Sequence, residues 1–162
     1  GRAGAVTMAA TGGVLVVGYG NGLRSDDGVG PAVAARLLDD PRLGGADVRT
    51  AHQLTPELAL DASDVALLVL VDAAVDVPAG EVAVRRLDPA AASTGEVMTH
   101  HVDPAGLAGL ARELWGASPA VVVVSVGVAS LDVGDRLSPV VEAAVPRAAD
   151  AVVAVIEEHR RA

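Results

Sequence analysis

The sequence contains no cysteine and no phenylalanine, and each absence removes a class of structure. Without cysteine there is no disulfide, no thiolate nucleophile and no zinc–thiolate site, a composition that fits the reducing cytoplasm. One tyrosine and one tryptophan are the only large aromatic side chains. The core must therefore be built from valine, leucine and alanine, packed closely because no large ring fills the gaps.

Positive charge is also scarce. Twelve Lys and Arg residues stand against 21 Asp and Glu residues, which gives a formal net charge of −9 at pH 7. Neither nucleic acid nor an anionic membrane surface attracts such a chain, so we expect neither as a partner. The longest apolar run beyond the N-terminal residues, 65–71, is far too short to cross a bilayer.

Residues 1–13 are small and weakly apolar, without the continuous hydrophobic segment of a signal peptide. We expect them to form a flexible N-terminal extension, followed by a single domain over residues 14–159. A length of 162 residues is ordinary for one domain. We expect this compact acidic domain to be a monomer.

The apolar pattern predicts strands that alternate with helices. Continuous apolar runs predict strands buried on both faces, whereas alternating runs predict strands near a sheet edge. Strands that alternate with helices indicate an α/β fold with a largely parallel sheet. The buried strands are expected at 14–18, 65–71 and 120–126, the edge strands at 47–52 and 81–87, and the helices at 29–37, 55–61, 104–114 and 138–156, the last kinked at Pro146.

The segment 14–30 joins an apolar strand, a glycine-rich turn and a helix, as a dinucleotide site does. Gly18 and Gly20 match the first two glycines of the G-x-G-x-x-G fingerprint, but Leu23 occupies the third position. The helix start that would receive a pyrophosphate already carries Asp26 and Asp27. Two carboxylates repel an anion, so this turn favours a cation or an activated water.

Three side chains from distant parts of the chain are expected to meet near this turn. Asp27 follows the first strand, Asp72 stands directly at the end of the 65–71 strand, and His100 lies in the loop after the fourth strand. Ligands of parallel sheets bind beyond the carboxyl ends of the strands. Two carboxylates and an imidazole suit a divalent first-row metal ion that keeps open positions for substrate or water.

Four segments of the chain resemble the hydrogenase maturation proteases. They are 18–30, which reads GYGNGLRSDDGVG, 71–73, 99–100 and 127–145, and the likeness runs from Val14 to about Ile156. The resemblance implies a three-layer α/β/α sandwich around a five-stranded, mostly parallel twisted sheet. It also implies an endopeptidase that removes a C-terminal extension from the large-subunit precursor of a nickel–iron hydrogenase after nickel insertion.

The resemblance assigns the metal contacts and catalysis to Asp27, Asp72 and His100, with His101 as the alternative histidine. The nickel is expected to arrive with the precursor. Asp26 is expected to cap the helix or to orient its neighbour, and His52 and Trp115 are expected to be structural or surface residues.

Other hydrolytic motifs are missing. No G-x-S-x-G sequence surrounds Ser125, and no H-E-x-x-H zinc helix occurs. In place of a serine nucleophile or a resident zinc ion, a cation would polarise the peptide carbonyl and activate water, with one of the two aspartates as general base. Two other interpretations remain open at this stage, a non-catalytic module that binds a small ligand or nucleotide, and a related α/β peptidase with another client.

Overall fold

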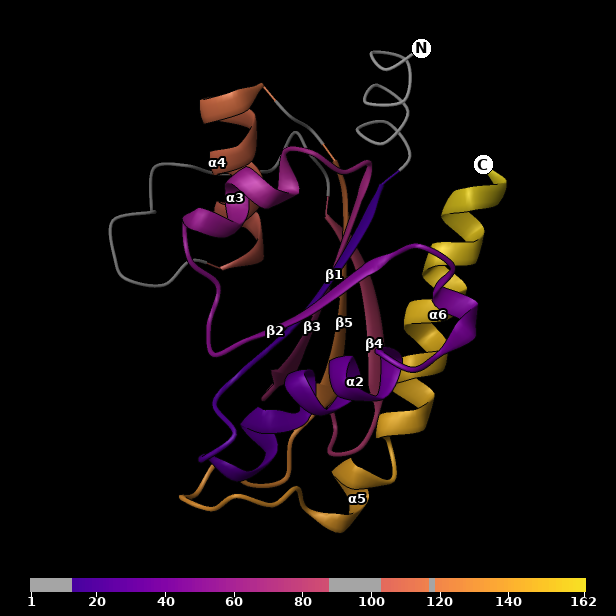
Figure 1. Ribbon diagram of the computed structural model, residues 1–162. Coiled ribbons are helices and arrows are strands. Elements are labelled where there is room, and N and C mark those ends of the chain that lie inside the picture. Colours follow the sequence, from indigo (N-terminus) through magenta and orange to yellow (C-terminus); the bar gives the residue numbers. More distant parts are fainter. Residues whose placement is uncertain (1–12, 88–102, 117–118) are drawn as a thin grey trace.

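A computed structural model describes residues 13–87, 103–116 and 119–162 (Figure 1). Within them five strands form one sheet in the order β2-β1-β3-β5-β4. All neighbouring strands are parallel except β4, which pairs antiparallel with β5. The extension expected over residues 1–13 falls, apart from Gly13, outside the described residues, as do His100 and His101. The strands are β1 (Val14–Tyr19), β2 (Asp47–Ala51), β3 (Leu67–Ala74), β4 (Val82–Leu87) and β5 (Ala120–Gly127).

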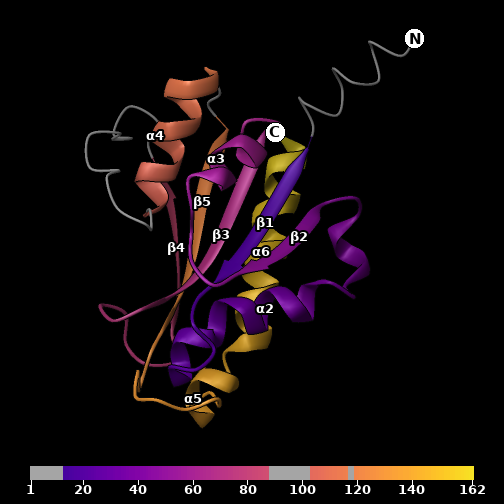
Figure 2. The same cartoon turned by 60° about the vertical axis from the view of Figure 1, so that its left-hand side comes forward.

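Helices cover both faces of this sheet (Figures 1 and 2). On one face lie α2 and α6, and on the other lie α3 and α4. A short 3-10 helix, η1, precedes α2, and a second one, η2, follows it. The helices are η1 (Ser25–Gly28), α2 (Val29–Leu37), η2 (Pro41–Leu43), α3 (Glu57–Ala62), α4 (Pro104–Trp115), α5 (Pro139–Glu142) and α6 (Val145–Arg161).

The core consists of two layers separated by the sheet. Because side chains alternate along a strand, Val14 and Val16 of β1 face the layer under α2 and α6, whereas Leu15 and Val17 face α3 and α4. Every buried apolar side chain of the described residues is valine, leucine or alanine except Ile156. The three-layer α/β/α architecture and the central place of the three apolar strands are thus as predicted.

The first turn of α2 packs unusually close to the ends of two central strands. A Cβ atom added to Gly30 would lie 2.4 Å from the carbonyl oxygen of Tyr19 and 2.5 Å from that of Val71. Only glycine allows this approach. The close packing places the segment before α2 directly over the carboxyl ends of β1 and β3.

Three sequence predictions about element ends were wrong. Asp72 does not end its strand, because β3 continues to Ala74 and Asp72 pairs with Ser125 of β5. The last helix is two helices rather than one kinked helix, because Pro146 fits the first turn of α6 and not a helix interior. The N-cap of α3 is Pro56, which makes no side-chain capping bond, and not Thr55.

Candidate functional site

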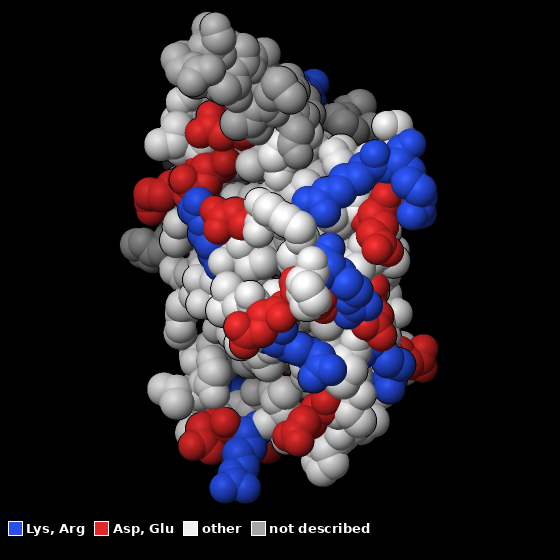
Figure 3. Space-filling model, turned by 45° about the vertical axis from the view of Figure 1, so that its right-hand side comes forward, with Lys and Arg blue, Asp and Glu red and all other residues white. Residues whose placement is uncertain are grey.

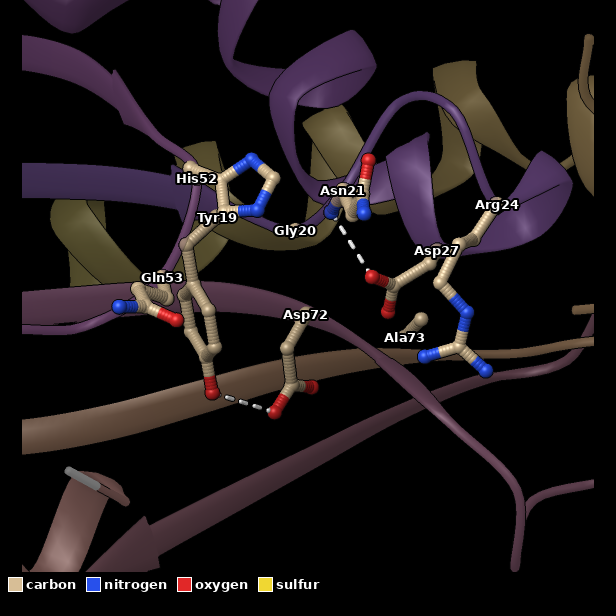
Figure 4. Close-up of a pocket in the computed structure, with 9 residues that line it drawn as sticks. All are labelled: Tyr19, Gly20, Asn21, Arg24, Asp27, His52, Gln53, Asp72 and Ala73. Atoms are coloured by element: carbon tan, nitrogen blue, oxygen red, sulfur yellow. Dashed lines mark hydrogen bonds between the residues drawn. The ribbon is translucent and has the colours of Figure 1, made fainter. Parts of the chain in front are cut away.

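A cleft of about 330 Å³ opens at the carboxyl edge of the parallel strands (Figure 4). Its walls come from the turn after β1, the residues after β2, and the last part of β3. Asp72 lies between the two sides in the view of Figure 4, with Asp27 on one side and His52 on the other. The lining residues are Tyr19, Gly20, Asn21, Arg24, Asp27, His52, Gln53, Asp72 and Ala73.

Asp27 is presented to the cleft by the tight turn between β1 and α2. The Asn21 amide donates a hydrogen bond of 2.8 Å to Asp27 Oδ2, and the Asp27 amide donates one of 3.1 Å to the Arg24 carbonyl. Gly20 has φ 151°, and a Cβ atom there would lie 1.9 Å from the Asp27 carbonyl oxygen. No hydrogen bond from a described residue reaches Asp27 Oδ1, and Asp27 lines the cleft.

Asp72 lies deeper, inside β3, and both of its oxygens accept hydrogen bonds. The Tyr19 hydroxyl donates to Oδ2 at 2.8 Å, and the Ser125 hydroxyl donates to Oδ1. Burial raises the pKa of Asp72 above its ordinary value, although the hydroxyls of Ser125 and Tyr19 act to lower it. Burial and the neighbouring carboxylate raise the pKa of Tyr19 as well, so this phenol stays protonated and acts as a donor.

Asp26 points away from the cleft and is fully buried. It accepts hydrogen bonds from the amides of Ala129, Ser130 and Ser138, at 2.8, 2.9 and 2.6 Å, and from the Ser138 hydroxyl at 2.8 Å. Burial alone acts to raise the pKa of Asp26, but these hydrogen bonds outweigh it and hold the pKa below its ordinary value. None of these donors belongs to η1 or α2, so the side chain does not cap its own helix.

The structure brings together Asp27 and Asp72, the two carboxylates predicted for the site, whereas His100 lies outside the described residues. Among the residues that the structure does describe, no three histidine or acidic side chains are close enough together to hold a metal ion. The full set of Asp27, Asp72 and His100 therefore stays a prediction.

Sequence reasoning missed four residues that line the cleft, Tyr19, Arg24, His52 and Gln53. His52 was expected to be a structural or surface residue, but it lines the wall opposite Arg24. Gln53, the next residue, lines the same wall. The position of His52 could have indicated a place in the cleft, because it directly follows β2, a parallel strand that neighbours β1. Tyr19 was also missed, since the partner of its hydroxyl is 53 residues away in the sequence.

The arrangement suits hydrolysis of a bound carbonyl compound. One carboxylate, Asp27, lines the cleft with no hydrogen bond from a described residue on its Oδ1, and a second, Asp72, is half-buried and oriented by two hydroxyl donors. A carboxylate with a raised pKa is a better proton acceptor near neutral pH than an ordinary one. A cation held beside it would polarise the carbonyl.

Comparison of the sequence with protein-family models and with curated proteins gives no match. Comparison with solved structures does give matches. The chain is similar to the hydrogenase maturating endopeptidase HybD from E. coli, with 26% sequence identity and a TM-score of 0.69 over 91% of this chain and 93% of that one. It is also similar to the hydrogenase 2 maturation peptidase from Thaumarchaeota archaeon SCGC_AB-539-E09, with 26% identity and a TM-score of 0.67 over 89% of this chain and 97% of that one.

The chain has the fold of the hydrogenase maturation endopeptidases. The [NiFe] hydrogenase maturation protease HycI from Thermococcus kodakarensis KOD1 shares this fold, with 20% identity and a TM-score of 0.67 over 97% of this chain and 99% of that one. The predicted resemblance is therefore confirmed, and the likeness to the first two structures supports a protease role. No helix among the described residues is long and apolar enough to cross a membrane.

Proposed function

We propose that this protein is an endopeptidase that removes the C-terminal extension of a nickel–iron hydrogenase large-subunit precursor after nickel insertion. The observation that carries the proposal is the pair of carboxylates, Asp27 and Asp72, on one cleft of a hydrogenase maturation endopeptidase fold. Nickel enters as part of the substrate. Its presence in the cleft would mark the precursor as ready for cleavage.

In this proposal Asp27, Asp72 and His100 contact the nickel of the precursor. Asp27 offers its open oxygen Oδ1, and carboxylate and imidazole groups suit a divalent first-row ion. Of the two aspartates, Asp72 is the better candidate for the general base, because the hydroxyls of Tyr19 and Ser125 fix the orientation of its carboxylate. The nickel would polarise the scissile carbonyl, and Asp72 would accept a proton from the attacking water.

The nucleotide-binding alternative is not supported by the cleft. A phosphate at the start of α2 would meet Asp27, whose carboxylate accepts a hydrogen bond from the Asn21 amide of the turn. That amide is one of the donors that a phosphate would need.

The test is to incubate the purified protein with nickel-loaded and nickel-free precursor and to follow loss of the tail by mass spectrometry. We expect cleavage of the nickel-loaded precursor only. Asp72→Asn should lower the cleavage rate by at least about a hundredfold, the range of a lost general base. Asp64→Asn is the matched control, because Asp64 is exposed, does not line the cleft and is not among the charges that act on Asp72. Equal cleavage of the nickel-free precursor, or an active Asp72→Asn variant, would contradict the proposal.

A further inference from the structure

The buried carboxylate of Asp26 joins two segments more than 100 residues apart. It belongs to the turn that presents Asp27, yet all four of its hydrogen-bond donors lie in the segment 129–138. Among the described residues it is the only buried charged side chain, and none of their ion pairs includes it. A buried charge without a counter-ion persists only when hydrogen bonds replace its water.

Backbone hydrogen bonds join the same two segments, and here the turn after β1 supplies donors to the segment 129–138. The amides of Ser25 and Asp26 donate to the carbonyl oxygens of Gly134 and Ser130, at 2.8 and 3.1 Å. The Gly134 amide donates in return to the Leu23 carbonyl at 3.0 Å. Ser25 has φ 51°, a left-handed conformation that is uncommon for residues other than glycine, and its bonds to the far segment hold it there.

The position of Asp27 depends on this junction. Asp27 follows Asp26 across one planar peptide bond, so a displacement of the Asp26 backbone moves the Asp27 carboxylate directly. The Asn21 amide, which donates to Asp27 Oδ2, reports where that carboxylate lies. A carboxylate that contacts a reacting group must be held to within a fraction of an ångström.

We propose that Asp26 is a positioning residue, which sets the geometry of Asp27 by fastening the segment 129–138 to the turn after β1. Asp26 itself does not line the cleft. The effect on cleavage rests on the function proposed above, whereas the effect on the geometry of Asp27 does not.

Asp26→Asn tests the proposal, because the asparagine amide group presents N–H donors where the segment 129–138 also presents donors. Asp40→Asn is the matched control, since Asp40 also accepts hydrogen bonds from a nearby amide and side chain but lies by η2, away from the cleft. We expect Asp26→Asn to shift the Asn21 amide resonance and to speed its hydrogen exchange, and Asp40→Asn to leave both unchanged. In cleavage, kcat should fall on the order of a hundredfold in Asp26→Asn with KM little changed.

A milder pair of variants removes one donor only. The Ser138 hydroxyl donates to Asp26 Oδ2 and makes no capping bond to α5, so Ser138→Ala removes that contact alone and Ser138→Thr restores it. We expect the Asn21 amide to shift in Ser138→Ala and to return in Ser138→Thr. This pair decides the question if Asp26→Asn does not fold.

Each outcome has one meaning. If Asp26→Asn folds and its Asn21 amide is unchanged, the positioning role is overturned, whatever the cleavage rate. If Asp26→Asn does not fold, an unchanged Asn21 amide in Ser138→Ala overturns it in the same way. An amide that shifts as expected supports the positioning role, even if the wild type leaves the nickel-loaded precursor uncut. In that case it is the proposed function that fails.

Discussion

At the scale of single residues, one carboxylate in the cleft and one behind it lie in opposite electrostatic settings. Asp26 is buried among four donors, and its pKa lies below the ordinary value. Asp72 is half-buried with two hydroxyl donors, and its pKa lies above the ordinary value because the loss of solvent outweighs them. The first group therefore favours the folded state when it is ionised, whereas the second opposes it. Asp26 is therefore suited to a fixed structural role, and Asp72 is suited to exchanging a proton.

The raised pKa of Asp72 predicts how its replacement changes stability with pH. A carboxyl group whose pKa is raised by folding lowers the stability as pH rises from its ordinary pKa of 3.8 through the folded value. Asp72→Asn removes this loss, and the hydroxyls of Tyr19 and Ser125 can each accept from an amide as well as donate to it. We therefore expect the free energy of unfolding of Asp72→Asn, relative to wild type, to increase from acidic to neutral pH.

Urea unfolding at a series of pH values measures this difference. Asp64→Asn should show a much flatter profile, because Asp64 is exposed and is not among the charges that act on Asp72. A relative stability of Asp72→Asn that falls as pH rises would mean that the native site stabilises the ionised form of Asp72.

The sequence was informative about residues that follow strands and uninformative about their partners. Asp27 and Asp72 were expected at the carboxyl edge because each adjoins an apolar run. Asp26 was expected to cap or to orient, but its donors lie 103 to 112 residues away, and no local pattern indicates them. His52 was overlooked because one imidazole after an edge strand is a common surface feature.

At the scale of elements, the packing of α2 against the sheet decides where the turn with Asp27 lies. A side chain at Gly30 would collide with carbonyl oxygens of both β1 and β3. We expect Gly30→Ala to lower the free energy of unfolding by about 1–3 kcal/mol, the usual cost of overpacking. It should also slow cleavage, because α2 must move away from the strand ends and take the turn with it.

Chemical denaturation and the cleavage assay, applied to the same variant, check this prediction. Gly45→Ala is the control, because a Cβ atom there meets nothing within 4 Å. If Gly30→Ala were as stable and as active as Gly45→Ala, the contact between α2 and the strands would not determine the site.

The elements themselves were largely predictable because their causes are local. Three continuous apolar runs are found in the middle of the sheet, and the two alternating runs are found at its edges. The ends of the elements were harder to predict. A polar Asp72 after seven apolar residues looks like the end of a strand, yet pairing with β5 carries β3 two residues further. Whether Pro146 bends a helix or begins one depends on packing against the sheet, which the sequence does not display.

At the scale of the whole molecule, 21 Asp and Glu residues outnumber twelve Arg residues. On the face shown in Figure 3, Arg side chains lie among Asp and Glu side chains. Among the described residues, several charged side chains form ion pairs, such as Arg42 with Asp40 and with Asp150, and Arg86 with Glu158. A metal cation is attracted to any chain of net charge −9, so binding at the cleft must be separated from this general attraction.

Thermal shifts with single-charge variants make that separation. We expect Ni²⁺ or Cd²⁺ at about a hundred times its dissociation constant to stabilise the wild type by about 2.7 kcal/mol, and nucleotides to have no effect. Asp27→Asn and Asp39→Asn each remove one negative charge, but only Asp27 lines the cleft. The metal-induced shift should therefore disappear in Asp27→Asn and persist in Asp39→Asn. Separate His100→Ala and His101→Ala variants would show which imidazole completes the site. If both aspartate variants lost the shift equally, the cation would be responding to net charge rather than to the cleft.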